Sequence, residues 1–547
     1  MERGTLMNKQ WTMKQFMQGA VLLTIAALVV KALSAVYRIP FQNIVGDQGF
    51  YIYQQVYPFI GVLTVWTSYG FAVAISKLLA DEHGHSNQDK RRTILLVSFV
   101  YVSIISLISF LFLFLGADTL ATWMGDEKLA QLLKTGSFVV LLMPILALLK
   151  GSFQSEGRME PIAYGQVVEQ TVRVCVILVG TYFVVKSGAS LYTAGSTALF
   201  GALVGEVAGI VLLVFFLRSK RLLQGKVFPK AFSSMKPILK DLTIISLSVS
   251  MSSLILLFFQ LVDSFTIFKL LTENGFQRME AMETKGIYDR GLPLVQMGIL
   301  IASTLSLSIV PLIAHTTQKK SGRNAIPYAQ LTFRIAFLFG VAATLGLILV
   351  LPAVNEMLFE TRDLSTTLMV FCLQIFWLSL ILTVTSILQG LGKVIMPAVI
   401  LVCGLILKGL FNLLLVPQFG IMGAAIAGNI GFASITVGMY VYMQSVWKIR
   451  YASFRFYMHV FVASICMIAT VWSWTLLADI WLFDGFSNRI GAMMTALTSV
   501  TVGASVFLLY IAKSRIVAEK EWFLLPLGRR MAMLQLALNR RNRKGSL

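Results

Sequence analysis

Charged side chains inside long apolar runs are the residues of this sequence that could do chemistry. The bases are Lys31, Arg38, Arg173 and Lys408, and the acids are Glu169, Glu206 and Asp263. A charge at mid-bilayer costs at least ~2.5–3.5 kcal/mol on insertion scales, so each of these residues should face an aqueous cavity or a partner. Bases gathered in a cavity would stabilise an anion such as a diphosphate, which needs cations or donors to leave water.

Helical spacing sorts these charges into faces. Lys31, Ser34 and Arg38 lie on one face of the first predicted helix, which we expect to line a cavity. The alternative is that Arg38 extends outward and Lys31 pairs with an acid. Glu169 and Arg173 have the i, i+4 spacing of a structural ion pair.

Three further positions leave alternatives open. Lys408 and Asn412 are also spaced i, i+4, and they either line a cavity or bond backbone carbonyls. Asp263 either binds a cation or proton or pairs with a lysine, and Asp263 and Glu206 are the candidates for ion coupling.

The segment 285–296, KGIYDRGLPLVQ, brings Asp289 and Arg290 to the start of another apolar run. Gly291 and Pro293 weaken a helix there, and transporters place polar binding groups at interrupted helices. We therefore assign Asp289 and Arg290 to the binding site. The alternative is a helix start at the outer face, with Asp289 near its positive end.

The elements that carry these residues follow from composition. The chain has 547 residues, of which 57% are hydrophobic and only 13% charged, and its mean hydropathy is +0.78. These values exclude a soluble globular enzyme and a disordered chain. We predict an all-α polytopic membrane protein with about fourteen spans. The predicted spans are 15–37, 51–76, 93–116, 133–149, 162–184, 193–217, 242–268, 291–314, 329–351, 365–388, 395–416, 420–443, 457–477 and 490–512.

The net charge of +21 lies between the apolar runs, which indicates the inner face of a membrane and not nucleic-acid binding. An inner N-terminus with alternating spans places most Lys and Arg inside, so both termini and the loops 218–240 and 315–328 should be cytoplasmic. Lys77 is interpreted as a cytoplasmic anchor at the membrane surface. The basic amphipathic tail 513–547 is predicted to form an interfacial helix over 519–547 on anionic lipid, and the alternative is a frayed basic tail that only fixes the topology.

An internal repeat is visible. Residues 150–161 read KGSFQSEGRMEP and residues 386–397 read SILQGLGKVIMP, so that Gln, Gly, a base and Pro recur in the same order. A duplication is typical of transporters with a central site. We predict an N-terminal lobe at 1–217, a cytoplasmic linker at 218–241, a C-terminal lobe at 242–443 and an extra helix pair at 444–512.

Signatures of catalysis and metal binding are missing from the sequence. It contains no GxxxxGK[ST] and no HExxH, and its four cysteines lie in apolar runs. His83 and His85 form only a weak metal motif. We expect no enzyme activity, no cofactor and no metal.

Several stretches resemble the MOP flippase superfamily, specifically its polysaccharide-transporter and MurJ-like branch, in the Gram-positive group of MurJ-type lipid II flippases and stage V sporulation protein B. They are 31–58, 76–82, 150–174, 261–267, 285–296 and 386–399. The resemblance implies two six-helix lobes, an additional helix pair, a central cavity, alternating access and a polyprenyl-diphosphate-oligosaccharide substrate.

The resemblance also implies site residues. Asp289–Arg290 matches an Asp-Arg pair at the eighth helix of MurJ-type proteins, and Lys31 falls on a basic position of the first helix. The family's Arg-Asp pair on that helix is similar to Tyr37–Arg38 here, with only the positive charge kept. The second-helix arginine of enterobacterial members is missing; residues 58–61 occupy that region.

The leading function is therefore a flippase for a lipid-linked cell-envelope saccharide in a bacterial cytoplasmic membrane. The substrate-binding candidates are Lys31, Arg38, Asp289, Arg290 and Lys408. The expected partners are the lipid-linked oligosaccharide, anionic lipids and cell-envelope synthases, and we expect a monomer. A MATE-like cation-coupled drug exporter is the alternative, and a non-transporting scaffold for envelope synthases is a third hypothesis.

Overall fold

A computed structural model describes residues 22–81, 88–217, 235–300, 302, 326–393, 395–448, 451–478, 488–522 and 528–544. Helices make up nearly all of these ranges, and no strand occurs in them. Twelve helical segments of the described chain are long and apolar enough to cross a membrane. The longest, Leu22–Ala80, is 59 residues long and covers the first two predicted spans.

Every predicted span except the eighth overlaps one of these segments. The eighth span, 291–314, runs beyond the described residues. The loops 218–240 and 315–328 and the His83–His85 pair also lie largely or wholly outside them. The structure therefore confirms an all-helical polytopic membrane protein, while the count of fourteen spans stays a prediction.

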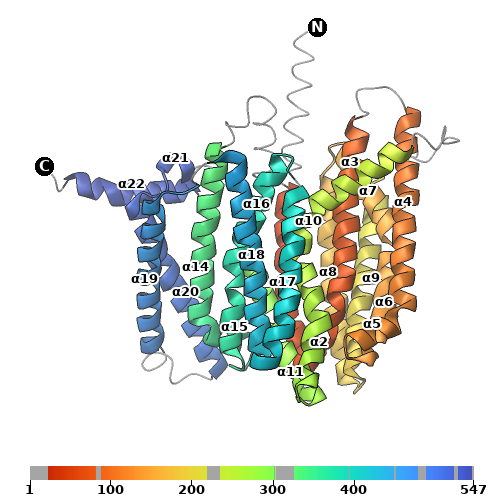
Figure 1. Ribbon diagram of the computed structural model, residues 1–547, viewed down its shortest axis with the longest axis horizontal. Helices are drawn as coiled ribbons and strands as arrows, with labels where there is room; N and C mark the ends of the chain where they lie inside the picture. Colours follow the sequence, from red (N-terminus) through yellow and green to blue (C-terminus); the bar gives the residue numbers. More distant parts are fainter. Residues whose placement is uncertain are drawn as a thin grey trace, which may run out of the picture. The chain divides into compact units, whose positions relative to one another are not determined.

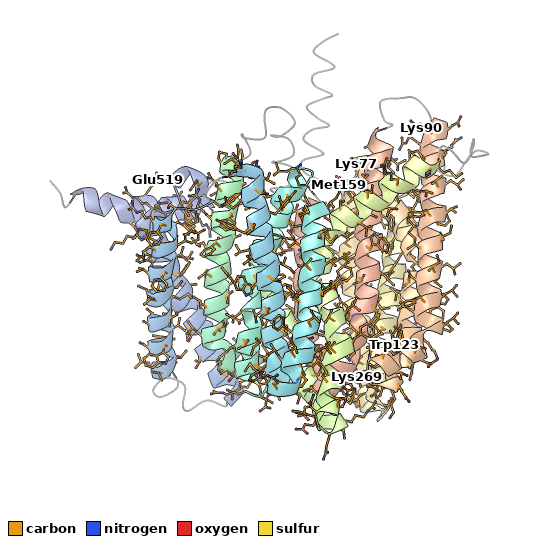
Figure 2. All side chains as sticks on the ribbon, in the orientation of Figure 1. Lys77, Lys90, Trp123, Met159, Lys269 and Glu519 are labelled. Carbon is orange, nitrogen blue, oxygen red and sulfur yellow. The ribbon has the colours of Figure 1, made fainter. Side chains whose placement is uncertain are left out.

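The chain forms two compact units, and the first consists of Met1–Asp289 with Lys408–Ala424. After helical residues 22–36, its elements are α2 (Arg38–Val65), η1 (Trp66–Phe71), α3 (Ala72–Asp81), α4 (Gln88–Leu115), α5 (Ala117–Trp123), η2 (Glu127–Leu129), α6 (Ala130–Val140), α7 (Met143–Ser155), α8 (Glu160–Lys186), α9 (Leu191–Phe215), α10 (Met235–Glu273) and α11 (Arg278–Asp289) (Figure 1). Figure 2 shows Lys77 and Lys90 at one end of these helices and Trp123 and Lys269 at the other.

The second unit consists of Arg290–Leu407 with Ala425–Leu547. Its elements are α12 (Gly291–Gly298), α14 (Ile326–Phe359), α15 (Ser365–Cys372), α16 (Gln374–Gly390), most of α17 (Ile395–Phe419) and α18 (Ile421–Trp447), α19 (Phe454–Leu477), α20 (Asn488–Ser514), α21 (Glu519–Trp522) and α22 (Gly528–Lys544). The compact units differ from the predicted lobes, because α10 and α11 group with the first unit. The predicted lobe boundaries stay a prediction.

The two copies of the sequence repeat have the same local structure, one in each unit. Gly157 and Gly392 both have φ of 72°. Arg158 N donates to Phe153 O (3.0 Å) and Lys393 N donates to Leu388 O (2.8 Å). Both copies are thus helix C-caps with a left-handed glycine and the 6→1 backbone hydrogen bond of a Schellman motif. The pattern of Gln, Gly and a base in the sequence encodes this turn.

This cap yields a prediction on stability. A Cβ on Gly392 would meet nothing within 4 Å, so Gly392→Ala costs only the left-handed backbone penalty, ~1–2 kcal/mol. The matched control is Gly346→Ala inside α14, where a Cβ also meets nothing, and there alanine should stabilise by up to ~1 kcal/mol. Thermal unfolding of purified protein should shift in opposite directions for the two variants. Equal shifts would contradict the assigned cap.

Candidate functional site

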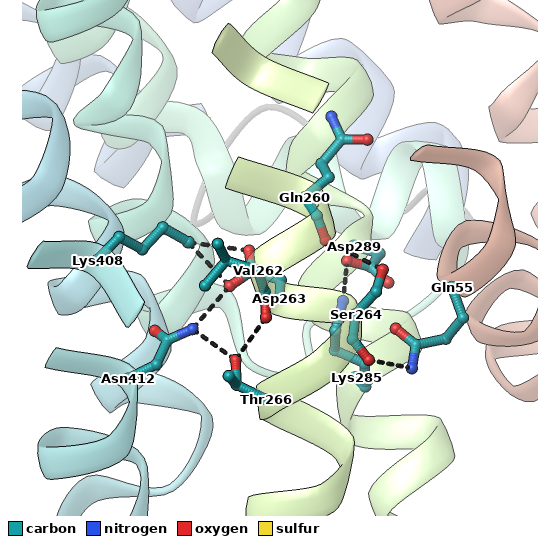
Figure 3. A network of polar contacts seen from close by, with 10 residues as sticks. All are labelled: Gln55, Gln260, Val262, Asp263, Ser264, Thr266, Lys285, Asp289, Lys408 and Asn412. Atoms are coloured by element: carbon teal, nitrogen blue, oxygen red, sulfur yellow. Dashed lines mark hydrogen bonds and ion pairs between the residues drawn. The ribbon is translucent and has the colours of Figure 1, made fainter. Parts of the chain in front are cut away.

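A buried polar network joins α10 to the second half of α17 within the first unit (Figure 3). Lys408 Nζ lies 2.8 Å from Asp263 Oδ1 and 3.0 Å from Oδ2. Asn412 Nδ2 donates to Asp263 Oδ1 (3.0 Å) and to Thr266 Oγ1 (2.8 Å). Of the alternatives that the sequence leaves open for Asp263, the structure has the lysine pair, and Lys408 bonds a carboxylate instead of backbone carbonyls.

A second buried pair lies within α11, where Lys285 Nζ is 2.5 Å from Asp289 Oδ1. Asp289 is thus the last residue of one helix and pairs with the base one turn earlier. The sequence interpretation missed Lys285, although its i, i+4 spacing from Asp289 is the signal for such a pair. A Cβ on Gly286 would lie 2.1 Å from the backbone oxygen of Asp47, so this glycine lets α11 approach α2 closely.

Arg38, the first residue of α2, is 1% exposed and carries its guanidinium 4.8 Å from the centre of the Tyr57 ring. Its Nε and Nη1 have no hydrogen-bond partner among the described residues. Asp289 is near enough to interact with Arg38 electrostatically, and also interacts with Asp263. A buried cation whose donors are unused is costly to maintain, and an anionic ligand would satisfy it.

These charges form one electrostatic group, the central polar cluster, made up of Arg38, Asp263, Lys285, Asp289 and Lys408. All five side chains are buried. Three cations face two carboxylates, so the cluster carries one excess positive charge when all five groups are ionised. Such a set can take up an additional negative charge at low cost.

Lys31 lies apart from this cluster. It is exposed and makes no ion pair with any residue that the structure describes. Lys77 is exposed as well.

Arg290 belongs to the second unit, where it begins α12. Its Nη1 donates to Thr361 Oγ1 (2.9 Å) and Asn355 Oδ1 (3.3 Å), and its guanidinium lies over the Phe359 ring. Asn355 in turn donates to the backbone oxygen of Asp363 (3.0 Å). Arg290 therefore connects the start of α12 to the end of α14 and the loop that follows.

A separate charge network links α7, α8 and α9. Arg173 Nη2 lies 3.4 Å from Glu169 Oε1 and 3.6 Å from Glu206 Oε1, and Lys150 Nζ lies 3.3 Å from Glu169 Oε2. Glu206 is fully buried, and neither of its oxygens has a hydrogen-bond partner in the described part of the chain. A Cβ on Gly205 would lie 2.7 Å from Glu169 O, so this glycine allows α8 and α9 to pack closely enough for the contact.

Residues that bind metals do not gather in the described ranges. No group of three or more His, Cys, Asp or Glu in those ranges could hold a metal ion. The cysteines are free: Cys372 is buried, while Cys175 and Cys403 are exposed.

Comparisons with known proteins show the family to which the chain belongs. A family model described as polysaccharide biosynthesis protein matches residues 16–317. The uncharacterized membrane protein YabM of Bacillus subtilis (strain 168) is 37% identical over 532 residues, covering 96% of this chain and 97% of the relative. The lipid II flippase MurJ of the same organism is 24% identical over 448 residues, covering 78% of this chain and 82% of the relative.

A solved structure shows the same fold. Lipid II flippase MurJ in an inward closed conformation superposes with a TM-score of 0.67 at 14% identity, covering 90% of this chain and 98% of that chain. Taken with the family model and the relatives, this fold identifies the chain as a member of the polysaccharide biosynthesis protein family, in the MurJ-like branch of the MOP flippase superfamily.

Proposed function

We propose that this protein is a flippase that moves a polyprenyl-diphosphate-linked cell-envelope saccharide outward across the bacterial cytoplasmic membrane by alternating access. The observation that carries the proposal is the central polar cluster, with its excess positive charge and the unused donors of buried Arg38. A diphosphate leaves water only where cations and donors replace its hydration. The relationship to a lipid II flippase supports this class of substrate.

The residues have different roles in the proposal. Arg38 and Lys285 bind the diphosphate, while Asp289 holds Lys285 in place until the anion arrives. Lys408 is held by both oxygens of Asp263, so it does not contact the diphosphate directly. Its contribution to binding is the electrostatic potential of the Asp263–Lys408 pair at the diphosphate. Lys31 is exposed, which suits a first contact with an anionic head group. The lipid tail stays in the bilayer throughout.

Ion coupling has two candidates with different surroundings. Asp263 already holds a tethered ammonium and the Asn412 amide. Glu206 lies near the Arg173 guanidinium and also interacts electrostatically with Glu169 and Lys150, and both of its oxygens lack hydrogen bonds within the described residues. If transport is coupled to protons, Glu206 is the carboxyl group that we expect to carry them, because a desolvated carboxylate with few donors gains most from protonation.

A MATE-like exporter of cationic drugs is the competing function. It would need a carboxylate available to a soluble cation, whereas Lys408 occupies Asp263 and the Arg173 guanidinium lies beside Glu206. Both functions predict a multi-pass protein, and the twelve membrane-length helical segments of the described chain agree with that. We propose that the protein lies in the cytoplasmic membrane with both termini inside. Cell-envelope synthases and anionic lipids are the proposed partners of the flippase, which we propose acts as a monomer.

Complementation tests the proposed function. A bacterial strain depleted of its lipid II flippase should grow when this chain is expressed, and a chain with Arg38→Ala should not restore growth at equal membrane level. Resistance to cationic dyes, measured in the same cells, should not change. If the chain does not restore growth but raises resistance to the dyes, the result favours the exporter.

Arg290 gives a sharper distinction between binding and structure. Its planar guanidinium can grip a diphosphate through two parallel hydrogen bonds, which an ammonium cannot reproduce. If Arg290 binds substrate, Arg290→Lys should lose transport by on the order of tenfold or more while the unfolding temperature stays near that of the parent.

Thr361→Val is the matched variant, because it removes the Oγ1 acceptor of Arg290 without touching the charge. A structural Arg290 would make both variants unstable and similarly impaired. An Arg290→Lys variant with full transport would remove Arg290 from the binding site.

A further inference from the structure

A cavity of about 770 Å³ lies in the second unit and is lined by none of the residues assigned above. Three elements enclose it: the early part of α14, the turn that leads into α19, and the residues that end and follow α20. Tyr451 forms a fixed part of its wall, because it is buried, packs against Phe333 and donates its hydroxyl to Met443 O (3.1 Å). The charge distribution of the sequence predicts that this end faces the cytoplasm.

The cavity is lined by three arginines and by no acid among its described lining residues. They are Arg334 of α14, Arg455 in the first turn of α19 and Arg515 just after α20. Arg334 pairs through Nη2 with Glu521 of α21, while its Nε has no hydrogen-bond partner within the described chain. Even with that pair, the lining keeps two positive charges, which favours an anionic ligand.

One backbone feature reinforces this preference, whereas the φ of 55° at Arg515 is that of a residue directly after a helix, as at Lys448 after α18. The 24-residue helix α19 begins at the cavity, capped by Ser453 Oγ, which accepts from Phe456 N (3.2 Å). The positive end of its dipole therefore adds to the field of the arginines.

An apolar stripe on α19 starts at the same place. Phe454, which lines the cavity, is 77% exposed, and the exposed side chains of Met458, Phe461 and Ile465 follow it at helical spacing. A ligand with a phosphate at one end and acyl chains at the other matches both the arginines and this stripe. A free phosphate would use the arginines alone.

We propose that this cavity binds the phosphodiester head group of an anionic phospholipid of the inner leaflet, with its acyl chains along the exposed face of α19. This inference is independent of the proposed transport function, since it uses none of the residues of the central polar cluster. The bound lipid would fasten α14, α19 and α20 together at the membrane surface.

Thermal unfolding of the full chain in detergent tests the proposal, with phosphatidylglycerol, phosphatidylcholine or inorganic phosphate added. We expect phosphatidylglycerol alone to raise the unfolding temperature. Arg455→Gln combined with Arg515→Gln should weaken its apparent affinity by on the order of tenfold or more, because two charge-assisted contacts are lost. Both arginines are exposed, so this variant should fold.

The matched control is Lys448→Gln combined with Lys513→Gln, which removes two exposed positive charges of the same unit outside the cavity lining. It should respond to phosphatidylglycerol as the parent does. If the apparent affinity for phosphatidylglycerol falls equally in both double variants, the effect is due to general surface charge, and the proposed site is refuted. Stabilisation by inorganic phosphate to the same extent would overturn the lipid assignment.

If the arginine pair variant is unstable without lipid, Arg455→Glu alone should abolish the phosphatidylglycerol response, and a full response would refute the proposal.

Discussion

Replacing Arg38 with alanine is expected to abolish transport, by a factor of about 100 or more, while the protein remains folded. The guanidinium is 1% exposed, and two of its nitrogens lack partners in the described chain, so its removal breaks no hydrogen bond at those atoms. Two charge-assisted bonds to a substrate phosphate would each be worth roughly 1.5–3 kcal/mol, which accounts for the size of the loss. Transport is measured by growth of a flippase-depleted strain and by labelling of lipid-linked saccharide at the cell surface.

The control for Arg38 is Lys77→Ala, which removes an exposed base from the same unit. It should leave transport within about twofold of the parent, because an exposed cation is screened by solvent and salt. Arg38→Lys keeps the charge over the Tyr57 ring and should retain part of the activity. If all variants are produced at the same level and Arg38→Ala is fully active, the substrate does not bind at Arg38.

Breaking the Asp263–Lys408 pair from one side should have the largest effect on stability. Both side chains are buried, and Lys408→Met leaves the Asp263 carboxylate without its cation. Loss of one partner of a buried pair typically costs about 3–5 kcal/mol. We expect a large fall in the unfolding temperature of the purified protein for Lys408→Met, and a similar fall for Asp263→Leu, which strands the ammonium.

The double variant Asp263→Asn with Lys408→Met separates structure from binding. It removes both charges, and the amide oxygen introduced at position 263 can still accept from Asn412, so most of the lost stability should return. A stable double variant that transports normally would make the pair purely structural. A stable double variant that fails to transport would show that the charges of the pair take part in transport, and a double variant as unstable as the singles would disprove the expected pairing energy.

Much of the fold is predictable because the bilayer makes local sequence decisive. Apolar runs must form helices where water is absent, so their positions follow from composition, and the membrane-length helical segments overlap every predicted span except the eighth. The caps at Gly157 and Gly392 are equally local, since a left-handed turn needs only a glycine at the right place. The family could be inferred from sequence for the same reason: its motifs are continuous segments.

The candidate site was only partly predictable. Four of its five residues stand out as charges in or beside an apolar run, namely Arg38, Asp263, Asp289 and Lys408. The sequence interpretation misses Lys285 because it groups Asp289 with its neighbour Arg290, whereas the pair runs along the helix between Lys285 and Asp289. Sequence neighbours point in different directions on a helix, and residues four apart share a face.

Partner choice across helices is what only the tertiary structure decided. Asp263 and Lys408 are 145 residues apart, and periodicity places each on its own helix without saying which helices are adjacent. Adjacency depends on close-packing positions such as Gly286 against Asp47, which let particular helices approach. Composition and helical period therefore establish a basic, multi-pass chain, and its continuous motifs carry the resemblance to flippases. The packing of helices distant in sequence determines that Lys408 is paired and that Arg38 keeps unused donors, because burial and hydrogen bonding depend on neighbours in space.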